Sequence, residues 1–141
     1  MRVIVGETDS QTPQMVDRFE FAEVNPYWNL PTNITADEIV PQVQAQGIGY
    51  LRRKDMEVVR NFSPDAKPIP PGSVRWTRAA ALAPKFLVRQ RPGKQNALGR
   101  IKFMFPNPKA IYLHDTPADS LFSRSARASA SATSRSATSP R

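Results

Sequence analysis

The amino-acid sequence predicts a mainly β fold with one or two short helices. Short runs of β-branched and aromatic residues, which are typical of strands, alternate with turn residues along the chain. The 14 prolines among 141 residues are about twice the usual share, and this disfavours long helices. Only one stretch of the chain carries the start signals of a helix.

Six strands are expected, two before the helical stretch and four after it. Most of these runs end in Gly, Pro or Asn, residues that favour turns over continued strands. The expected strands are residues 1–6, 19–26, 56–62, 85–93, 99–107 and 110–117.

The expected helix lies within residues 35–53. Thr35 is its predicted N-cap, and two acidic residues follow in the first turn, where a carboxylate complements the helix dipole. Pro41 fits an early helical position, and Gly47 weakens the end of the helix. Residues 63–76 hold four prolines and a glycine, so we expect a linker or flap there.

The other connecting segments follow from composition. Residues 27–35 are predicted to be a loop, and residues 118–127 to form a helical turn or two. Of the last 19 residues, 12 are Ser or Ala and none is large and apolar. Such a segment buries too little surface to offset its ordering entropy, so we expect residues 123–141 to be a disordered tail.

The net charge of +8 is open to two interpretations. It fits an anionic partner such as nucleic acid, or a solvated basic surface with a basic tail. The second is favoured, because no RNP, zinc-finger or helix-turn-helix motif accompanies the charge. We therefore expect no nucleic-acid partner, and the sequence makes no prediction of an oligomeric state.

Residue types exclude several kinds of site. With one histidine and no cysteine, no metal site is expected. The sequence also has no glycine-rich phosphate-binding loop, so no cofactor is expected. No apolar run has the length of a membrane span, and no signal peptide is visible. As written, the chain is therefore expected to stay in the cytoplasm.

His114, the sole histidine, ends a predicted strand. A strand that delivers a histidine into a turn can place a general base at the rim of a sheet, although a lone histidine is more often structural. Asp115 points to the opposite strand face, so we expect it to form the turn rather than orient the ring. Tyr27 and Trp28 suit either a binding cleft or the core.

Several motifs in this order resemble a known family. They are "NPYWNLP", "RQRPG", "NALGRIKFMFPN" and "IYLHDTP". Together, over about residues 1–128, they resemble the catalytic domain of the larger L,D-transpeptidases, the YkuD-domain enzymes that cross-link peptidoglycan. The resemblance implies a β-rich sandwich-like fold and stem peptides of peptidoglycan as partners. It also implies a periplasmic or cell-envelope location and a cysteine acyl-enzyme, which carbapenems target.

The resemblance assigns roles residue by residue. His114 matches the general base that activates the thiol, and Tyr112, on the same strand face, matches a residue of the cleft. Tyr27 and Trp28 resemble parts of the flap over the donor stem peptide, to which residues 37–76 also correspond. Asn96 and the Gly99-Arg100 turn resemble scaffold positions, with substrate contact expected at Asn96.

The family pattern breaks after the histidine. A Ser-x-Gly-Cys-x-Arg motif, which supplies the nucleophile, is expected about 19 residues later and would fall near Thr133. This chain has a Ser/Ala tail there. The domain is thus predicted to be incomplete at its C-terminus, with residues 1–122 as a partial catalytic domain.

Two causes fit the break. One is a truncated or degenerate gene product. The favoured one is a reading-frame slip within residues 123–130, because the vocabulary of the tail fits GC-rich DNA read out of frame.

The sequence therefore predicts an L,D-transpeptidase-like domain that is inactive as written, because the nucleophilic cysteine is absent. The alternative is a pseudo-enzyme that binds stem peptides without reacting. A basic nucleic-acid-binding protein is a third hypothesis, which no motif favours.

Overall fold

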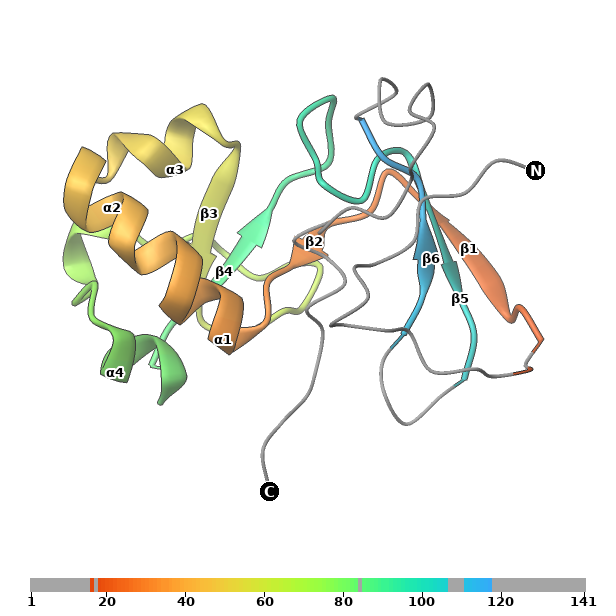
Figure 1. The fold of residues 1–141 in the computed structure, drawn as a ribbon, viewed down its shortest axis with the longest axis horizontal. Coiled ribbons are helices and arrows are strands. Elements are labelled where there is room, and N and C mark those ends of the chain that lie inside the picture. The colour runs from red at the N-terminus through yellow and green to blue at the C-terminus, as the bar shows by residue number, and fades with distance from the viewer. Residues whose placement is uncertain (1–15, 17, 84, 107–110, 118–141) are drawn as a thin grey trace, which may run out of the picture. The chain divides into compact units, whose positions relative to one another are not determined.

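The computed structural model describes residues 16, 18–83, 85–106 and 111–117 (Figure 1). The strand expected at residues 1–6, the helical turn at 118–127 and the tail with Thr133 lie outside the described residues. Among the residues that the structure describes, no helix has the length and apolar character needed to span a bilayer.

The chain divides into two compact units, which are described separately. Unit 1 comprises Met1–Pro26 and Ala97–Arg141, and unit 2 comprises Tyr27–Asn96. Unit 2 is thus an insertion in the sequence of unit 1. The flap expected at residues 37–76 lies inside unit 2, and its bounds stay a prediction.

Unit 1 contains a three-stranded antiparallel sheet in the order β1-β5-β6 (Figure 1). Its strands are β1 (Phe21–Val24), β5 (Ile101–Met104) and β6 (Leu113–His114). All three lie within predicted strands, and with the second sheet they confirm the β-rich fold class. The strands are shorter than predicted; β1, for example, ends before Asn25, whose φ of +51° departs from an extended backbone, and Pro26.

The two faces of this sheet differ in chemistry. In the register, Phe21 pairs with Met104, Glu23 with Lys102 and Lys102 with His114, so these side chains share one face. The opposite face carries exposed apolar side chains, namely Val24, Ile101, Phe103 and Leu113. The chemical groups of unit 1 are therefore concentrated on one side of the sheet.

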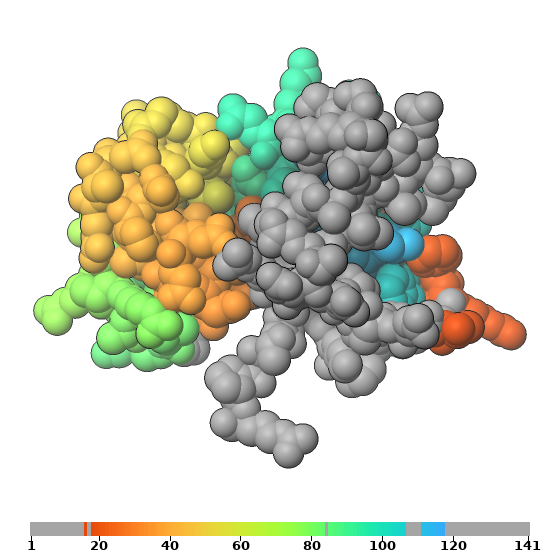
Figure 2. Space-filling view, in the orientation of Figure 1, coloured from red at the N-terminus to blue at the C-terminus, as the bar shows by residue number. Residues whose placement is uncertain are grey.

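Unit 2 contains a second antiparallel sheet, in the order β2-β4-β3. Its strands are β2 (Trp28–Asn29), β4 (Leu87–Gln90) and β3 (Met56–Val59). Its helical segments are α1 (Thr32–Ile34), η2 (Thr35–Ile39), α2 (Val40–Gln46), α3 (Gly49–Arg53), η3 (Pro71–Ser73) and α4 (Arg78–Leu82). In the space-filling view the residues of α1 to α3 (orange to yellow) form one continuous surface, beside α4 (green) (Figure 2).

Most of the buried apolar side chains belong to unit 2. They come from both its sheet and its helices, so strand and helix formation depend on the same core. The core residues are Trp28, Leu30, Ile34, Ala36, Ile39, Val40, Val43, Leu51, Val58, Val59, Ala81, Phe86 and Val88.

The main helical run begins earlier than the sequence predicts. It starts at Thr32 after Pro31, and the predicted N-cap Thr35 lies inside it. The Thr35 hydroxyl donates to the Pro31 carbonyl (3.2 Å), a bond within a helical turn rather than a cap. A π-helical turn, η2, comes just before Pro41, and its wider winding accommodates the missing N–H and the bulk of the ring.

Two short elements replace a predicted loop, and one helix was missed. Residues 27–35 contain β2 and the start of the helical run instead of a continuous loop. Burial of Trp28 and Leu30, at 5% and 1% exposure, explains this, because tertiary packing overrides a loop-like composition. The missed helix, α4, begins at a regular N-cap, where Thr77 Oγ1 accepts from Ala80 N (3.2 Å).

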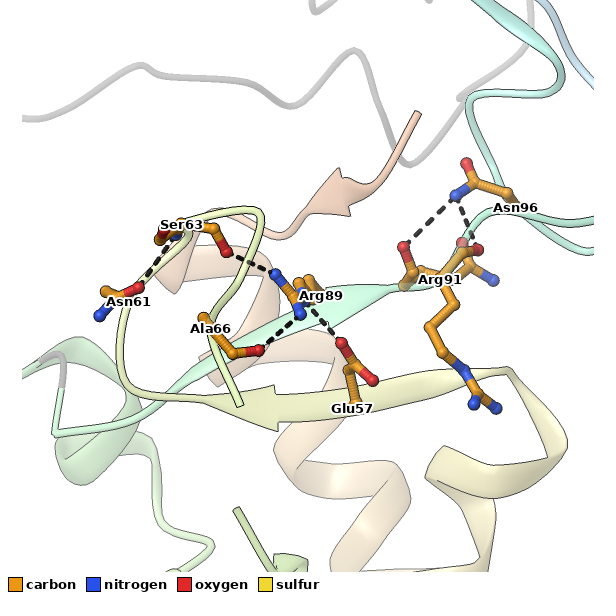
Figure 3. Close-up of polar contacts among 8 residues, drawn as sticks. Glu57, Asn61, Ser63, Ala66, Arg89, Arg91 and Asn96 are labelled. Atoms are coloured by element: carbon orange, nitrogen blue, oxygen red, sulfur yellow. Dashed lines mark hydrogen bonds and ion pairs between the residues drawn. The ribbon is translucent and has the colours of Figure 1, made fainter. Parts of the chain in front are cut away.

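A buried arginine holds the loop after β3 against the sheet of unit 2 (Figure 3). Arg89 on β4 donates from Nε to Glu57 on β3 (2.6 Å). Its Nη1 donates to the Ser63 carbonyl (2.9 Å) and its Nη2 to the Ala66 carbonyl (3.0 Å). The guanidinium also lies 4.2 Å from the ring centre of Tyr27. Each of the three guanidinium nitrogens therefore donates a hydrogen bond, and a buried charge requires such partners.

Replacing Glu57 with Gln should lower the free energy of unfolding by roughly 3 kcal/mol, because Arg89 would keep a buried charge without its counter-ion. Chemical denaturation measures this. Asp37→Asn is the matched control, since the Asp37–Arg78 pair is exposed and should cost less than about 1 kcal/mol. Equal losses in the two variants would contradict this interpretation of Arg89.

Candidate functional site

The pairing of β6 with β5 fixes the position of His114. His114 lies opposite Lys102 in the register, and both project from the same face of the sheet. Tyr112, two residues earlier, lies beside the histidine, with ring centres 6.0 Å apart. The predicted neighbours Tyr112 and His114 are therefore brought together.

A backbone carbonyl orients the His114 ring. Nδ1 lies 2.5 Å from the carbonyl oxygen of Asp115. A carbonyl can only accept, so Nδ1 carries the proton and donates it. In the neutral ring this leaves the lone pair on Nε2, which is the arrangement a general base requires.

The surroundings of His114 favour its neutral form. Burial lowers the pKa of the imidazole, and the Lys102 ammonium lowers it further. The hydrogen bond to the Asp115 carbonyl and the charge of Asp115 act in the opposite direction, but they do not outweigh burial. The half-buried ring is therefore unprotonated, and available to accept a proton, near neutral pH.

Lys102 links the charged and aromatic groups of this face. Its Nζ lies 4.2 Å from the ring centre of Tyr112, which is a cation–π distance. Burial lowers the pKa of the Lys102 ammonium, and Glu23, its partner on β1, partly offsets this. Burial also raises the pKa of the Tyr112 phenol, which therefore stays protonated. Glu23, Lys102 and His114 form a row across the three strands.

The turn before β5 contacts the side chain of Asp115, the residue after His114. Gly99 has φ +64°, and a Cβ there would lie 2.6 Å from the Asp115 side chain. Asp115 Oδ2 accepts from Arg100 N (3.1 Å), and Asp115 N donates to the Ile101 carbonyl (2.9 Å). As expected, the Asp115 side chain does not orient the His114 ring, but it binds the backbone of Arg100 rather than that of its own turn, and the Asp115 carbonyl orients the ring. Its partner at Arg100 is 15 residues away in sequence.

A hollow of about 370 Å³ lies beside Tyr112 and Lys102. Phe21 and Met104 line it from β1 and β5, and Phe105, Pro106, Ile111 and Glu20 complete the lining. The hollow thus combines apolar walls with one cation and one carboxylate. Such a mixed lining suits a peptide. The described residues hold no group of three or more His, Asp or Glu side chains that could bind a metal ion.

The remaining predicted site residues belong to unit 2. Tyr27 is half-buried under the Arg89 guanidinium, and Trp28 is 5% exposed within the core. Asn96 is 1% exposed, and its Nδ2 donates to the Arg91 carbonyl (3.0 Å), which closes the loop after β4 (Figure 3). Substrate contact by these three residues stays a prediction.

Comparison with known proteins decides the family. The model of the L,D-transpeptidase catalytic domain, YkuD, matches residues 1–137. The chain belongs to the YkuD L,D-transpeptidase family. A relative from Haemophilus influenzae, named "Putative L,D-transpeptidase", is 35% identical over 127 residues, which cover 90% of this chain. The chain spans a quarter of the length of that curated relative.

Membership of the YkuD family confirms the resemblance in the sequence and extends it from residue 128 to residue 137. Lys102 was not singled out as a site residue, although it lies in the quoted motif "NALGRIKFMFPN". Its role depends on the pairing of β5 with β6, since it lies 12 positions before His114 in the chain. A local sequence pattern does not reveal such cross-strand neighbours, because they depend on strand register.

The sole histidine allows a direct titration. By NMR, the His114 ring should titrate below its ordinary pKa of about 6.5. Lys102→Met should raise that pKa, because it removes a nearby cation, whereas the exposed Lys94→Met should leave it unchanged. In the unmutated protein, the pKa of His114 is lower in the folded chain than in the unfolded chain, so the unfolded chain binds the proton more tightly. The free energy of unfolding should therefore fall as the pH drops below about 6.5. A pKa above 6.5, or no response to Lys102→Met, would contradict this electrostatic description.

Gly99→Ala should displace Asp115, because the added Cβ meets its side chain and the left-handed backbone strains alanine. We expect a loss of roughly 2 kcal/mol in stability and a shifted His114 ring signal in NMR spectra. Gly72→Ala is the control, since a Cβ at Gly72 meets nothing within 4 Å. An unchanged His114 signal in Gly99→Ala would refute the coupling.

Proposed function

We propose that this chain is the base-bearing part of an L,D-transpeptidase catalytic domain. The family activity is peptidyl transfer between stem peptides of peptidoglycan in the cell envelope, through a cysteine acyl-enzyme. The observation that supports it most is the His114 ring, whose Nδ1–H is held by a carbonyl and whose Nε2 is free to accept a proton. By the resemblance, that nitrogen would take the proton of the nucleophilic thiol.

These 141 residues contain no cysteine. We therefore propose that they do not form an acyl-enzyme by themselves. A histidine base alone leaves no covalent intermediate, because the acyl group needs a thiolate to receive it. The reading-frame slip near residues 123–130 remains our explanation for the missing thiol, and translation of the underlying DNA in its other two frames tests it. Absence of a Gly-Cys pair in both frames would exclude the slip.

Incubation with a carbapenem should leave the mass of the purified chain unchanged, because no thiolate is present to open the lactam ring. Intact-protein mass spectrometry measures this. A covalent mass increase would show that another side chain acts as nucleophile and would refute the proposed inactivity.

The second candidate is a non-catalytic module that binds stem peptides. The hollow beside Tyr112 favours it, because its apolar walls and the Lys102 ammonium are available without a nucleophile. An extended peptide that carries carboxylates would match this combination of surfaces.

Binding of a peptidoglycan stem peptide should be saturable and should weaken about tenfold in Tyr112→Ala, which removes the aromatic wall and the partner of Lys102. Isothermal titration calorimetry measures this. Tyr50→Ala is a comparison variant. Tyr50 lies on α3 of unit 2, so this variant should bind the stem peptide with unchanged affinity. Trp28→Ala should also weaken binding if the flap assignment is correct. Unchanged affinity in both Tyr112→Ala and Trp28→Ala would eliminate the binding module.

A further inference from the structure

Unit 2 carries a second hollow, distinct in lining from the one beside Tyr112. It has a volume of about 190 Å³. Three cations lie around it, namely Arg60, Arg75 and Lys85, and no acidic side chain is among its lining residues. Ile69, Val74 and Phe86 supply apolar walls. The hollow therefore combines a concentration of positive charge with an apolar surface.

Within the part of the chain that the structure describes, none of the three cations has a counter-ion. Unit 2 contains 11 Lys and Arg against five Asp and Glu, so not every cation can be paired. Three of the five carboxylates are bound elsewhere, in the pairs Asp37–Arg78, Glu57–Arg89 and Asp55–Arg91. No ion pair among the described residues involves a cation of the hollow. Three like charges around one hollow repel one another unless an anion joins them.

The segments around the hollow are fixed to one another. Ile69 N donates to the Val58 carbonyl (2.9 Å), which holds the Pro-rich segment beside the end of β3, where Arg60 lies. Trp76 Nε1 donates to the Pro71 carbonyl (2.9 Å), and its ring packs on Phe86 with 5.0 Å between centres. The lining is thus tied together before any ligand arrives, and this lowers the ordering cost of binding.

From this arrangement we propose that the hollow lined by Arg60, Arg75, Lys85 and Phe86 binds the carboxylate end of an acidic peptide. The planar forks of the two arginines match a carboxylate, and the apolar walls take an aliphatic side chain next to it. The volume is below the ~300 Å³ of drug-sized pockets, so it admits an end group rather than a whole ligand. The choice of a peptide over a phosphate rests on the proposed function, which acts on peptides.

NMR titration of the full chain tests the site. The probe is an N-acetylated Ala-Leu-Glu peptide with a free C-terminus, and the neutral comparison peptide is N-acetylated Ala-Leu-Gln amide. The acidic peptide should shift the amides of Ile69, of residues 72–75 and of Phe86 to saturation, and the neutral peptide should not. About 0.5 M salt should weaken the binding, because the cations are exposed.

Matched variants separate the site from general surface charge. Arg75→Ala and Lys85→Ala should each weaken the acidic peptide roughly tenfold, as expected for loss of one charge-assisted hydrogen bond. Arg52→Ala and Lys94→Ala remove the same charges from exposed positions outside the hollow and should change the affinity less than about twofold. Equal losses in both pairs, or no saturable shift, would overturn the proposal.

Two further results separate this proposal from the proposed function. Inorganic phosphate that saturates the same amides while the acidic peptide does not would overturn the assignment to a peptide. Tyr112→Ala should leave these shifts intact, because Tyr112 belongs to unit 1. Loss of the shifts in Tyr112→Ala would assign them to the hollow of unit 1 and would also overturn the proposal.

Discussion

The antiparallel pairing of β5 with β6 is the constraint on which the candidate site depends. It places Lys102 opposite His114, and strand alternation then brings Tyr112 to the same face. The turn that precedes β5 completes the arrangement, because only a glycine at position 99 leaves room for the Asp115 side chain. With Asp115 held at Arg100 N, its carbonyl is positioned to orient the His114 ring. One strand pair thus determines the position, tautomer and electrostatics of the proposed base.

The two units differ in how much of their apolar surface is buried. Unit 2 buries apolar side chains from strands and helices in one core, and it can also bury Arg89 because four groups surround the guanidinium. In unit 1 one face of the described sheet remains apolar and exposed.

Local patterns in the sequence were sufficient for the β-rich class, for five of the six strand regions that the structure describes and for the placement of Tyr112 beside His114. The strand β2 and the early start of the helical run were not predictable, because burial of Trp28 and Leu30 decides them. The bond from Asp115 to Arg100 and the ion pair from Arg89 to Glu57 join residues 15 and 32 positions apart. Their partners depend on register, which no local pattern specifies.

The central claim is that His114 is held as a base with its proton on Nδ1 and its lone pair on Nε2. The ¹⁵N chemical shifts of its two ring nitrogens at a pH above its pKa test this most directly, and the sole histidine makes the assignment unambiguous. The account predicts that the Nδ1-protonated tautomer dominates, because the Asp115 carbonyl accepts from Nδ1. A dominant Nε2-protonated tautomer would contradict it, since the lone pair would then lie on Nδ1, against the Asp115 carbonyl, and Nε2 could not accept a proton.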